Sequence, residues 1–310
     1  MIEARGLVKR YGQTLAVDDL SFTVRSGMVT GFLGPNGAGK TTTMRMILGL
    51  DQPTAGTVTV DGRPHRHAAS PMREVGALID ARAAHGGRSA RNHLLCLAQT
   101  NGVSRRRVAE VLDIVGLSDV AGKRSKGFSL GMSQRLGIAA ALLGDPRVLM
   151  FDEPVNGLDP EGIVWIRNLM RSLAAEGRVV FVSSHLMSEM ENTADHLIVV
   201  GRGRLIADCG MAEFIDRSSG QAVMVRTSSP DALARAVAAA GGSVTREPDQ
   251  LRVRGLSEEQ VGDIAFANRV PVHHLAAAKV SLEQAFMELT ADSVEYRAAQ
   301  PVNQPVRQEA

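Results

Sequence analysis

GPNGAGKT, residues 34–41, is the stretch that decides the fold of this 310-residue chain. It fits the pattern G-x-x-x-x-G-K-[S/T], follows the apolar run MVTGFL (28–33) and precedes a helix expected over 40–50. Glycines let backbone N–H groups curl around phosphate oxygens, and the helix N-terminus adds a favourable potential. The sequence therefore predicts a phosphate-binding loop between a strand and a helix.

The residue types in this loop assign chemical roles. Lys40 brings a positive charge to the β- and γ-phosphates of a nucleotide, and Thr41 offers a hydroxyl to Mg²⁺. The residues expected to line the bound nucleotide are Gly34, Pro35, Asn36, Gly37, Ala38, Gly39, Lys40, Thr41 and Thr42.

VLMFDEP (148–154) supplies the acidic half of the predicted site. A short apolar run that ends in two carboxylates is typical of a buried parallel strand whose C-terminal end opens on a site. Asp152 is expected to hold Mg²⁺, and strand alternation points Glu153 away from Asp152. A carboxylate at position 153 is suited to orient and deprotonate an attacking water.

Two further residues have both a structural and a functional interpretation. His185 ends the next apolar strand, 33 residues after Asp152, and beside a phosphate site it can bind the γ-phosphate or the attacking water. Tyr11, in KRYG, can stack on an adenine base or simply pack at a strand end.

Composition excludes several classes of protein. A formal charge of +2 does not suggest nucleic acid as a partner, and the densest basic run, RRR (105–107), is interpreted as a solvated helix face. The chain has only two cysteines, Cys96 and Cys209, and they lack metal-ligand spacing. This cysteine usage excludes a disulfide scaffold and fits a reducing cytosol. No apolar stretch reaches 18 residues and the N-terminus lacks a signal core, so any membrane-spanning part is expected in another chain.

The order of predicted elements indicates an α/β chain with a second, smaller unit. Strands are expected over 1–62, helices over 90–143 with breaks at Gly102, Gly116 and Gly127, and a further helix over 160–176. The strand VVFVSSH (179–185) and a hairpin over 196–209 follow.

After Gly220 the pattern becomes β-α-β-β-α-β, which predicts a small α/β sandwich. SLEQAFMELT (281–290) is expected to be a capped helix, and the polar residues 291–310 a disordered tail. His273 and His274 are adjacent, so on a strand they face opposite ways and are not interpreted as metal ligands.

In this order, the motifs resemble the nucleotide-binding subunit of ATP-binding cassette (ABC) transporters over about residues 1–215. FSLGMSQR (128–135) takes the place of the family signature LSGGQ: Ser129 and Gly131 match, whereas Leu130 and Met132 depart from it. These departures resemble a branch of bacterial drug and antibiotic exporters, the ABC-2 type that includes daunorubicin-resistance proteins. The region after 220 resembles the C-terminal extension of that branch.

The resemblance implies a P-loop NTPase core over 1–215, with an antiparallel β subdomain and a helical subdomain at about 85–145, and an accessory domain over 220–290. It further implies ATP and Mg²⁺ as cofactors and a homodimer of cassettes packed head to tail. In that dimer Ser129 and the N–H groups near Gly131 bind the ATP held by the partner. NGLD (156–159) resembles the D-loop, with Asp159 as its carboxylate, and SSHLMSEME (183–191) the switch region.

REVGALID (73–80) contains another departure, because the family usually ends this segment with Gln and here the residue is Asp80. Gln offers an amide oxygen to Mg²⁺ and an N–H to water, whereas an ionised Asp only accepts. Asp80 can still ligate Mg²⁺, so its role stays open. Residues 80–100 lie where family members contact the membrane subunit.

The function expected from the resemblance is ATP hydrolysis at the cytoplasmic face of the membrane. It would power export of a drug-like, antibiotic-like or lipid-like substrate through a separate ABC-2-type permease. Two alternatives remain: a soluble ABC-type ATPase acting on ribosomes or DNA, and a P-loop kinase or GTPase. The first usually carries two cassettes or a long coiled coil, and the second does not account for FSLGMSQR, Glu153 and His185 together.

Overall fold

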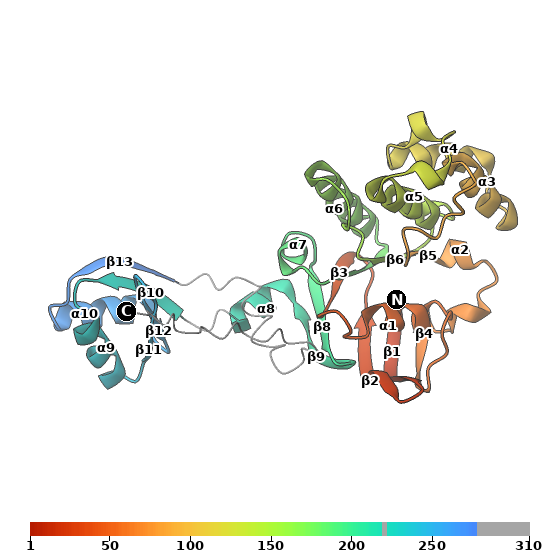
Figure 1. The fold of residues 1–310 in the computed structure, drawn as a ribbon. Helices are drawn as coiled ribbons and strands as arrows, with labels where there is room; N and C mark the ends of the chain where they lie inside the picture. Colours follow the sequence, from red (N-terminus) through yellow and green to blue (C-terminus); the bar gives the residue numbers. More distant parts are fainter. Residues whose placement is uncertain (219–221, 278–310) are drawn as a thin grey trace, which may run out of the picture.

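A six-stranded sheet forms the centre of the N-terminal unit, and the computed structural model of the protein describes residues 1–218 and 222–277. The strands run in the order β5-β6-β7-β3-β8-β9; all are parallel except β9, which pairs antiparallel with β8 (Figure 1). Their bounds are β3 Met28–Leu33, β5 Val75–Leu78, β6 Val148–Asp152, β7 Val179–Ser184, β8 His196–Gly201 and β9 Arg204–Gly210.

Both faces of this sheet are covered, which explains why β6 and β7 are continuous runs of buried residues. Along β7 the side chains alternate: Phe181 packs into one core cluster and Val182 into the other. In the first cluster Phe181 meets Phe22 and Phe32, with ring centroids 5.1 to 5.8 Å apart.

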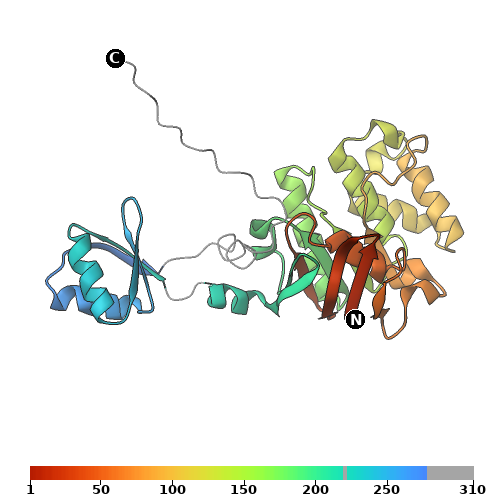
Figure 2. The ribbon, with the colours of Figure 1, turned by 60° about the horizontal axis from the view of Figure 1, so that its bottom comes forward.

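An antiparallel sheet of order β2-β1-β4 packs with the helix α1 (Lys40–Ile47) on this first face. Its strands are β1 Ile2–Tyr11, β2 Thr14–Val24 and β4 Ala55–Val60, the red and orange arrows in Figure 2. The expected strands within residues 1–62 are therefore confirmed.

A helical lobe made of α3 (Ala90–Thr100), α4 (Arg105–Ile114) and α5 (Leu130–Leu142) packs on the opposite face, as Figure 1 shows. Serine side chains at positions 89, 104 and 129 cap the three N-termini. The breaks at Gly102 and Gly116 are confirmed, with φ of 62° and 69°. The remaining helical elements between β4 and β8 are α2 Pro71–Glu74, α6 Pro160–Ala175, α7 Met187–Glu191 and the 3-10 turns η1 His65–His67, η2 Ser118–Val120 and η3 Ser125–Gly127.

The C-terminal unit has its own core, and the predicted β-α-β-β-α-β order is confirmed. Its antiparallel sheet runs β11-β12-β10-β13, the split β-α-β arrangement. The elements are β10 Ala222–Thr227, α9 Pro230–Ala239, β11 Ser243–Arg246, β12 Leu251–Arg254, α10 Glu258–Ala267 and β13 Val272–Ala277. The helix α8 (Met211–Ser218) was not predicted, and the expected helix 281–290 and tail 291–310 lie outside the described residues.

Candidate active site

The phosphate loop runs from the end of β3 to the start of α1, and its glycines are required by close backbone approaches. Gly39 caps α1 with φ of 93°, and a Cβ there would lie 2.5 Å from the Ala16 carbonyl oxygen. A Cβ on Gly34 would lie 2.4 Å from the Val200 carbonyl oxygen, and Gly37 has φ of 82°. A side chain at these positions would force the loop away from its neighbours or strain its backbone. The glycines of the G-x-x-x-x-G-K-[S/T] motif therefore have a steric cause.

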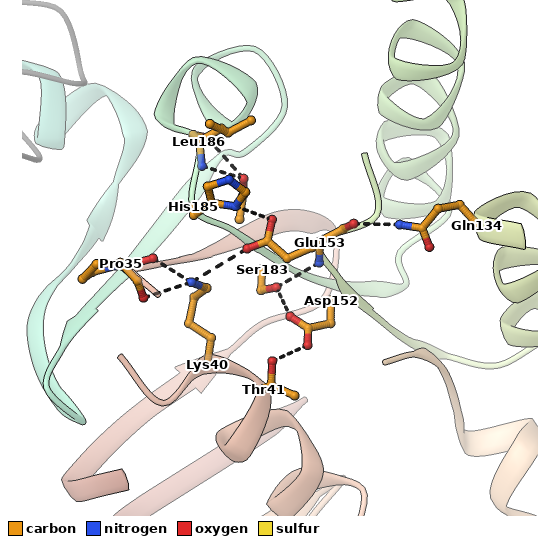
Figure 3. Close-up of polar contacts among 11 residues, drawn as sticks. Pro35, Lys40, Thr41, Gln134, Asp152, Glu153, Ser183, His185 and Leu186 are labelled. Atoms are coloured by element: carbon orange, nitrogen blue, oxygen red, sulfur yellow. Dashed lines mark hydrogen bonds and ion pairs between the residues drawn. The ribbon is translucent and has the colours of Figure 1, made fainter. Parts of the chain in front are cut away.

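Lys40 lies at the centre of the site with only 7% of its surface exposed. Its Nζ donates to the carbonyl oxygens of Gly34 (2.6 Å) and Pro35 (3.3 Å) and lies 3.8 Å from Glu153 Oε1 (Figure 3). Burial lowers the pKa of Lys40, while the carboxylates of Glu153 and Asp152 oppose that shift. Around it, Ala38 is buried, Thr42 is half-buried, and Asn36 and Gly37 are exposed.

Asp152, at the end of β6, binds the hydroxyls of two other elements. Thr41 Oγ1 donates to Asp152 Oδ2 at 2.5 Å, and Ser183 Oγ donates to Asp152 Oδ1. Oxygen donors of this kind are what Mg²⁺ prefers, and it usually takes one or two carboxylates together with substrate phosphates. Within the described part of the chain no group of three or more His, Cys, Asp and Glu could hold a metal alone. A magnesium ion here would be held by Thr41 and Asp152, with phosphate oxygens and water as its other ligands.

Glu153 stands one residue beyond β6 in a left-handed conformation, with φ of 49°. Its N–H donates to Ser183 Oγ at 3.1 Å, and its Oε2 lies 2.8 Å from His185 Nδ1. Strand alternation was therefore the wrong argument for its direction, because the residue lies outside the strand. Its carboxylate points toward Lys40 and His185 (Figure 3). Non-glycine residues in this conformation cost of order 1–3 kcal/mol and cluster at functional sites.

Gln134, on α5, is a site residue that the sequence analysis missed. Its side chain is buried, and Nε2 donates to the Glu153 carbonyl oxygen at 2.9 Å. Its Oε1 has no hydrogen-bond partner among the described residues. The available signal was a polar residue just before the apolar run of a helix, at a position that turns out to be buried. Gln134 thus fixes the strained Glu153 peptide to the helix that begins with the signature stretch.

Ser129, Gly131 and Asp159 lie away from this cluster. Ser129 is exposed and caps α5, accepting the Met132 N–H at 3.1 Å, and Asp159 caps α6, accepting the Gly162 N–H at 2.9 Å. A Cβ on Gly131 would lie 2.7 Å from the Gly157 carbonyl oxygen, so the two caps are packed together. None of their hydrogen bonds within residues 1–218 and 222–277 reaches the phosphate loop.

Comparisons with known proteins agree with this geometry. A model of the ABC transporter family matches residues 17–156, and a model of a domain of unknown function matches 221–283. An uncharacterized ABC transporter ATP-binding protein of Bacillus subtilis (strain 168) is 36% identical over 95% of this chain and 97% of its own length. The bacitracin transport ATP-binding protein of Bacillus licheniformis is 43% identical over 67% and 69%, respectively.

The chain belongs to the ABC transporter ATP-binding proteins. It is an ATPase with the family's P-loop α/β fold. A solved ATP-binding subunit of an ABC transporter superimposes with a TM-score of 0.64 at 26% identity, covering 70% of this chain and 92% of that one. No helix in the described ranges has the length and apolar character needed to cross a membrane.

Two predicted site residues of this ATPase have other partners in the structure. The Tyr11 hydroxyl donates to Asp51 Oδ2 at 2.7 Å, and Lys9 Nζ lies 4.8 Å from the ring centroid. Burial and then the Asp51 carboxylate raise the pKa of Tyr11, whose side chain stays 46% exposed. Asp80 is exposed just beyond β5 and accepts the Arg82 N–H at 2.8 Å.

Proposed function

We propose that this ATPase powers export of a drug-like, antibiotic-like or lipid-like substrate through a separate ABC-2-type membrane subunit. The contact of Glu153 with both Lys40 and His185 beside Asp152 carries the hydrolysis step of this proposal. The relatives support the cargo class by their names: bacitracin transport, lantibiotic transport in Streptococcus pyogenes, and Nod factor export in Burkholderia orbicola (strain AU 1054). The departures Leu130, Met132 and Asp80 favour the daunorubicin-resistance-like branch.

Each residue of the site has a separate role in the proposed reaction. Thr41 and Asp152, with Asp80 as a further candidate, would hold a Mg²⁺ that neutralises charge on the phosphates. The Lys40 ammonium stabilises the charge that develops on the γ-phosphate. Glu153 accepts a proton from the attacking water, and His185 fixes the Glu153 carboxylate through its Nδ1 contact.

Nucleotide contacts beyond the phosphates fit the same reaction. The exposed ring of Tyr11 lies at the edge of the phosphate-loop helix, where an adenine could stack on it. Residues 1–215 would form the nucleotide-binding domain, and 220–290 an accessory domain.

The proposed working unit is a homodimer in which each ATP lies between two copies. Ser129 and Gly131 are presented at an exposed helix N-terminus outside their own site, where they are free to meet a phosphate of the other copy. An anion at such a terminus contributes about 0.3–1 kcal/mol when exposed, and more when buried. Closure of the dimer would then depend on ATP, and hydrolysis would release it. The dimer would act as a peripheral complex at the cytoplasmic face of the membrane.

The variant Glu153→Gln tests this proposal. It keeps the shape of the side chain but removes the proton acceptor, so ATP should bind without being hydrolysed and the closed dimer should accumulate. Size-exclusion chromatography with MgATP would show a dimer peak that wild type lacks at steady state. A monomeric profile with normal turnover would refute the role of Glu153.

A further inference from the structure

The side chain of Tyr11 is held by a segment that lies 40 residues further along the chain. Tyr11 ends β1, and residues 48–54, which we call the α1–β4 connection, join α1 to β4. The Thr54 N–H donates to the Val8 carbonyl oxygen at 2.7 Å, which places the end of this connection against β1. Asp51 then lies beside the tyrosine, and its Oδ2 accepts the Tyr11 hydroxyl at 2.7 Å.

Asp51 is itself fixed by the helix that follows the phosphate loop. Arg45, on α1, donates to Asp51 Oδ2 through Nε at 2.8 Å and to Oδ1 through Nη2 at 3.4 Å. The Asp51 side chain is only 17% exposed, and the hydrogen bonds from Arg45 and then from Tyr11 lower the pKa of its carboxyl group. Through Asp51 and Arg45, the Tyr11 hydroxyl is thus tied to the helix that begins at Lys40.

One face of the Tyr11 ring is already occupied. Lys9 Nζ lies 4.8 Å from the ring centroid and donates to the Gln52 carbonyl oxygen at 2.7 Å, so the α1–β4 connection also fixes this ammonium group. A cation over an aromatic face is attracted by the quadrupole of the ring. Because Tyr11 is still 46% exposed, the opposite face of the ring is open to a flat ligand.

The bond between Tyr11 and Asp51 is not needed to hold the α1–β4 connection in place. Backbone N–H groups fix it at both ends, because Leu50 donates to the Arg45 carbonyl oxygen at 2.9 Å and Thr54 donates to β1. What the Asp51 carboxylate adds is a fixed position for the aromatic ring.

We propose that Asp51 is a positioning residue for the nucleotide base: by holding the Tyr11 hydroxyl, it keeps the ring at a fixed place relative to the phosphate loop. The proposal rests on the stacking of adenine on Tyr11, which is part of the function proposed above. A ring that is fixed before binding loses no side-chain freedom when a base stacks on it. Without Asp51 the ring must be ordered by the base, which weakens ATP binding by about two- to tenfold.

Calorimetric titration of the full chain with two magnesium complexes tests this inference. One ligand is the β,γ-imido analogue of ATP, which resists hydrolysis, and the other is inorganic tripolyphosphate, which has the phosphates but no base. Asp51→Ala should weaken binding of the analogue by about two- to tenfold and leave tripolyphosphate binding and kcat at saturating ATP unchanged. Tyr11→Phe keeps the ring and loses only the hydroxyl, so it should behave in the same way.

The double variant Tyr11→Phe/Asp51→Ala should bind the analogue no more weakly than either single variant, because both changes remove the same bond. The matched control is Glu74→Ala. Glu74 pairs with Arg63 at 2.7 Å and its side chain is 22% exposed, but it lies just before β5, at the edge of the sheet opposite the phosphate loop. This variant should bind both ligands like wild type.

Unchanged binding of the analogue in Asp51→Ala, or additive losses in the double variant, would overturn the proposal. An equal loss of tripolyphosphate binding would also overturn it, because Asp51 would then act on the phosphate loop through α1. Tyr11→Ala separates this proposal from the function on which it rests. If Tyr11→Ala weakens binding of the analogue and Asp51→Ala does not, only the role of Asp51 fails. If neither variant weakens it, adenine does not stack on Tyr11, and that part of the proposed function fails as well.

Discussion

Two helix N-termini of this ATPase are suited to phosphate, and they differ in what surrounds them. The N-terminus of α1 is built into the core: Lys40 is buried, and Thr41, Asp152 and Glu153 enclose it. The N-terminus of α5 is exposed, and Ser129 there bonds only its own helix. The difference teaches that the chain itself completes one half of the phosphate site, and it is the basis for the proposal that the exposed helix end of α5 meets the nucleotide of a second copy.

The largest expected effect is on ATP hydrolysis, and it distinguishes the roles of these two helix ends. Lys40→Ala should lower kcat by at least about 10²–10³-fold and weaken ATP binding, because a charge opposite the γ-phosphate is lost. Ser129→Arg should abolish hydrolysis while leaving the ATP affinity of the isolated subunit unchanged, because in the proposed dimer this serine contacts only the partner's nucleotide. Calorimetric titration of ATP into both variants checks this, and parallel loss of affinity in Ser129→Arg would break the distinction.

A smaller effect, on the stability of the protein, is expected where α5 packs against the loop that contains Gly157. Gly131→Ala places a Cβ 2.7 Å from the Gly157 carbonyl oxygen, so the signature helix must shift. We expect a loss of about 1–3 kcal/mol in the free energy of unfolding. Gly122→Ala is the matched control, because nothing lies within 4 Å of its Cβ. Denaturant unfolding compares the two, and equal stability would mean that the contact is loose.

The smallest effect concerns the link between α5 and Glu153. Gln134→Met keeps the volume but loses the donor to the Glu153 carbonyl, worth about 0.5–1.5 kcal/mol. The expected result is a two- to tenfold lower kcat at unchanged KM for ATP. Ser133→Ala removes a neighbouring hydroxyl that bonds Ser129 instead, and it should leave kcat unchanged. A change in KM alone would show that Gln134 acts on ATP binding rather than on Glu153.

Much of the fold and the inner half of the site could be predicted from the sequence, because local spacing controls them. The phosphate loop, Asp152 and His185 each follow a strand, and parallel strands bring their ends to one edge of a sheet. Gln134 could not be found this way, since it lies within the helix α5 rather than at a strand end, and only tertiary packing brings it to the Glu153 carbonyl. The direction of the Glu153 side chain was also missed, because strand alternation applies only inside strands and Glu153 lies beyond β6 in the left-handed conformation.

The central claim is that each ATP is held by Lys40 of one copy and Ser129 of the other. Mixing the inactive variants Lys40→Ala and Ser129→Arg tests it directly. In a head-to-tail dimer both lesions fall at one site and the second site keeps an intact lysine and an intact serine, so the mixture should recover ATP hydrolysis that neither variant shows alone. A mixture that forms dimers yet stays inactive at every ratio would contradict the account.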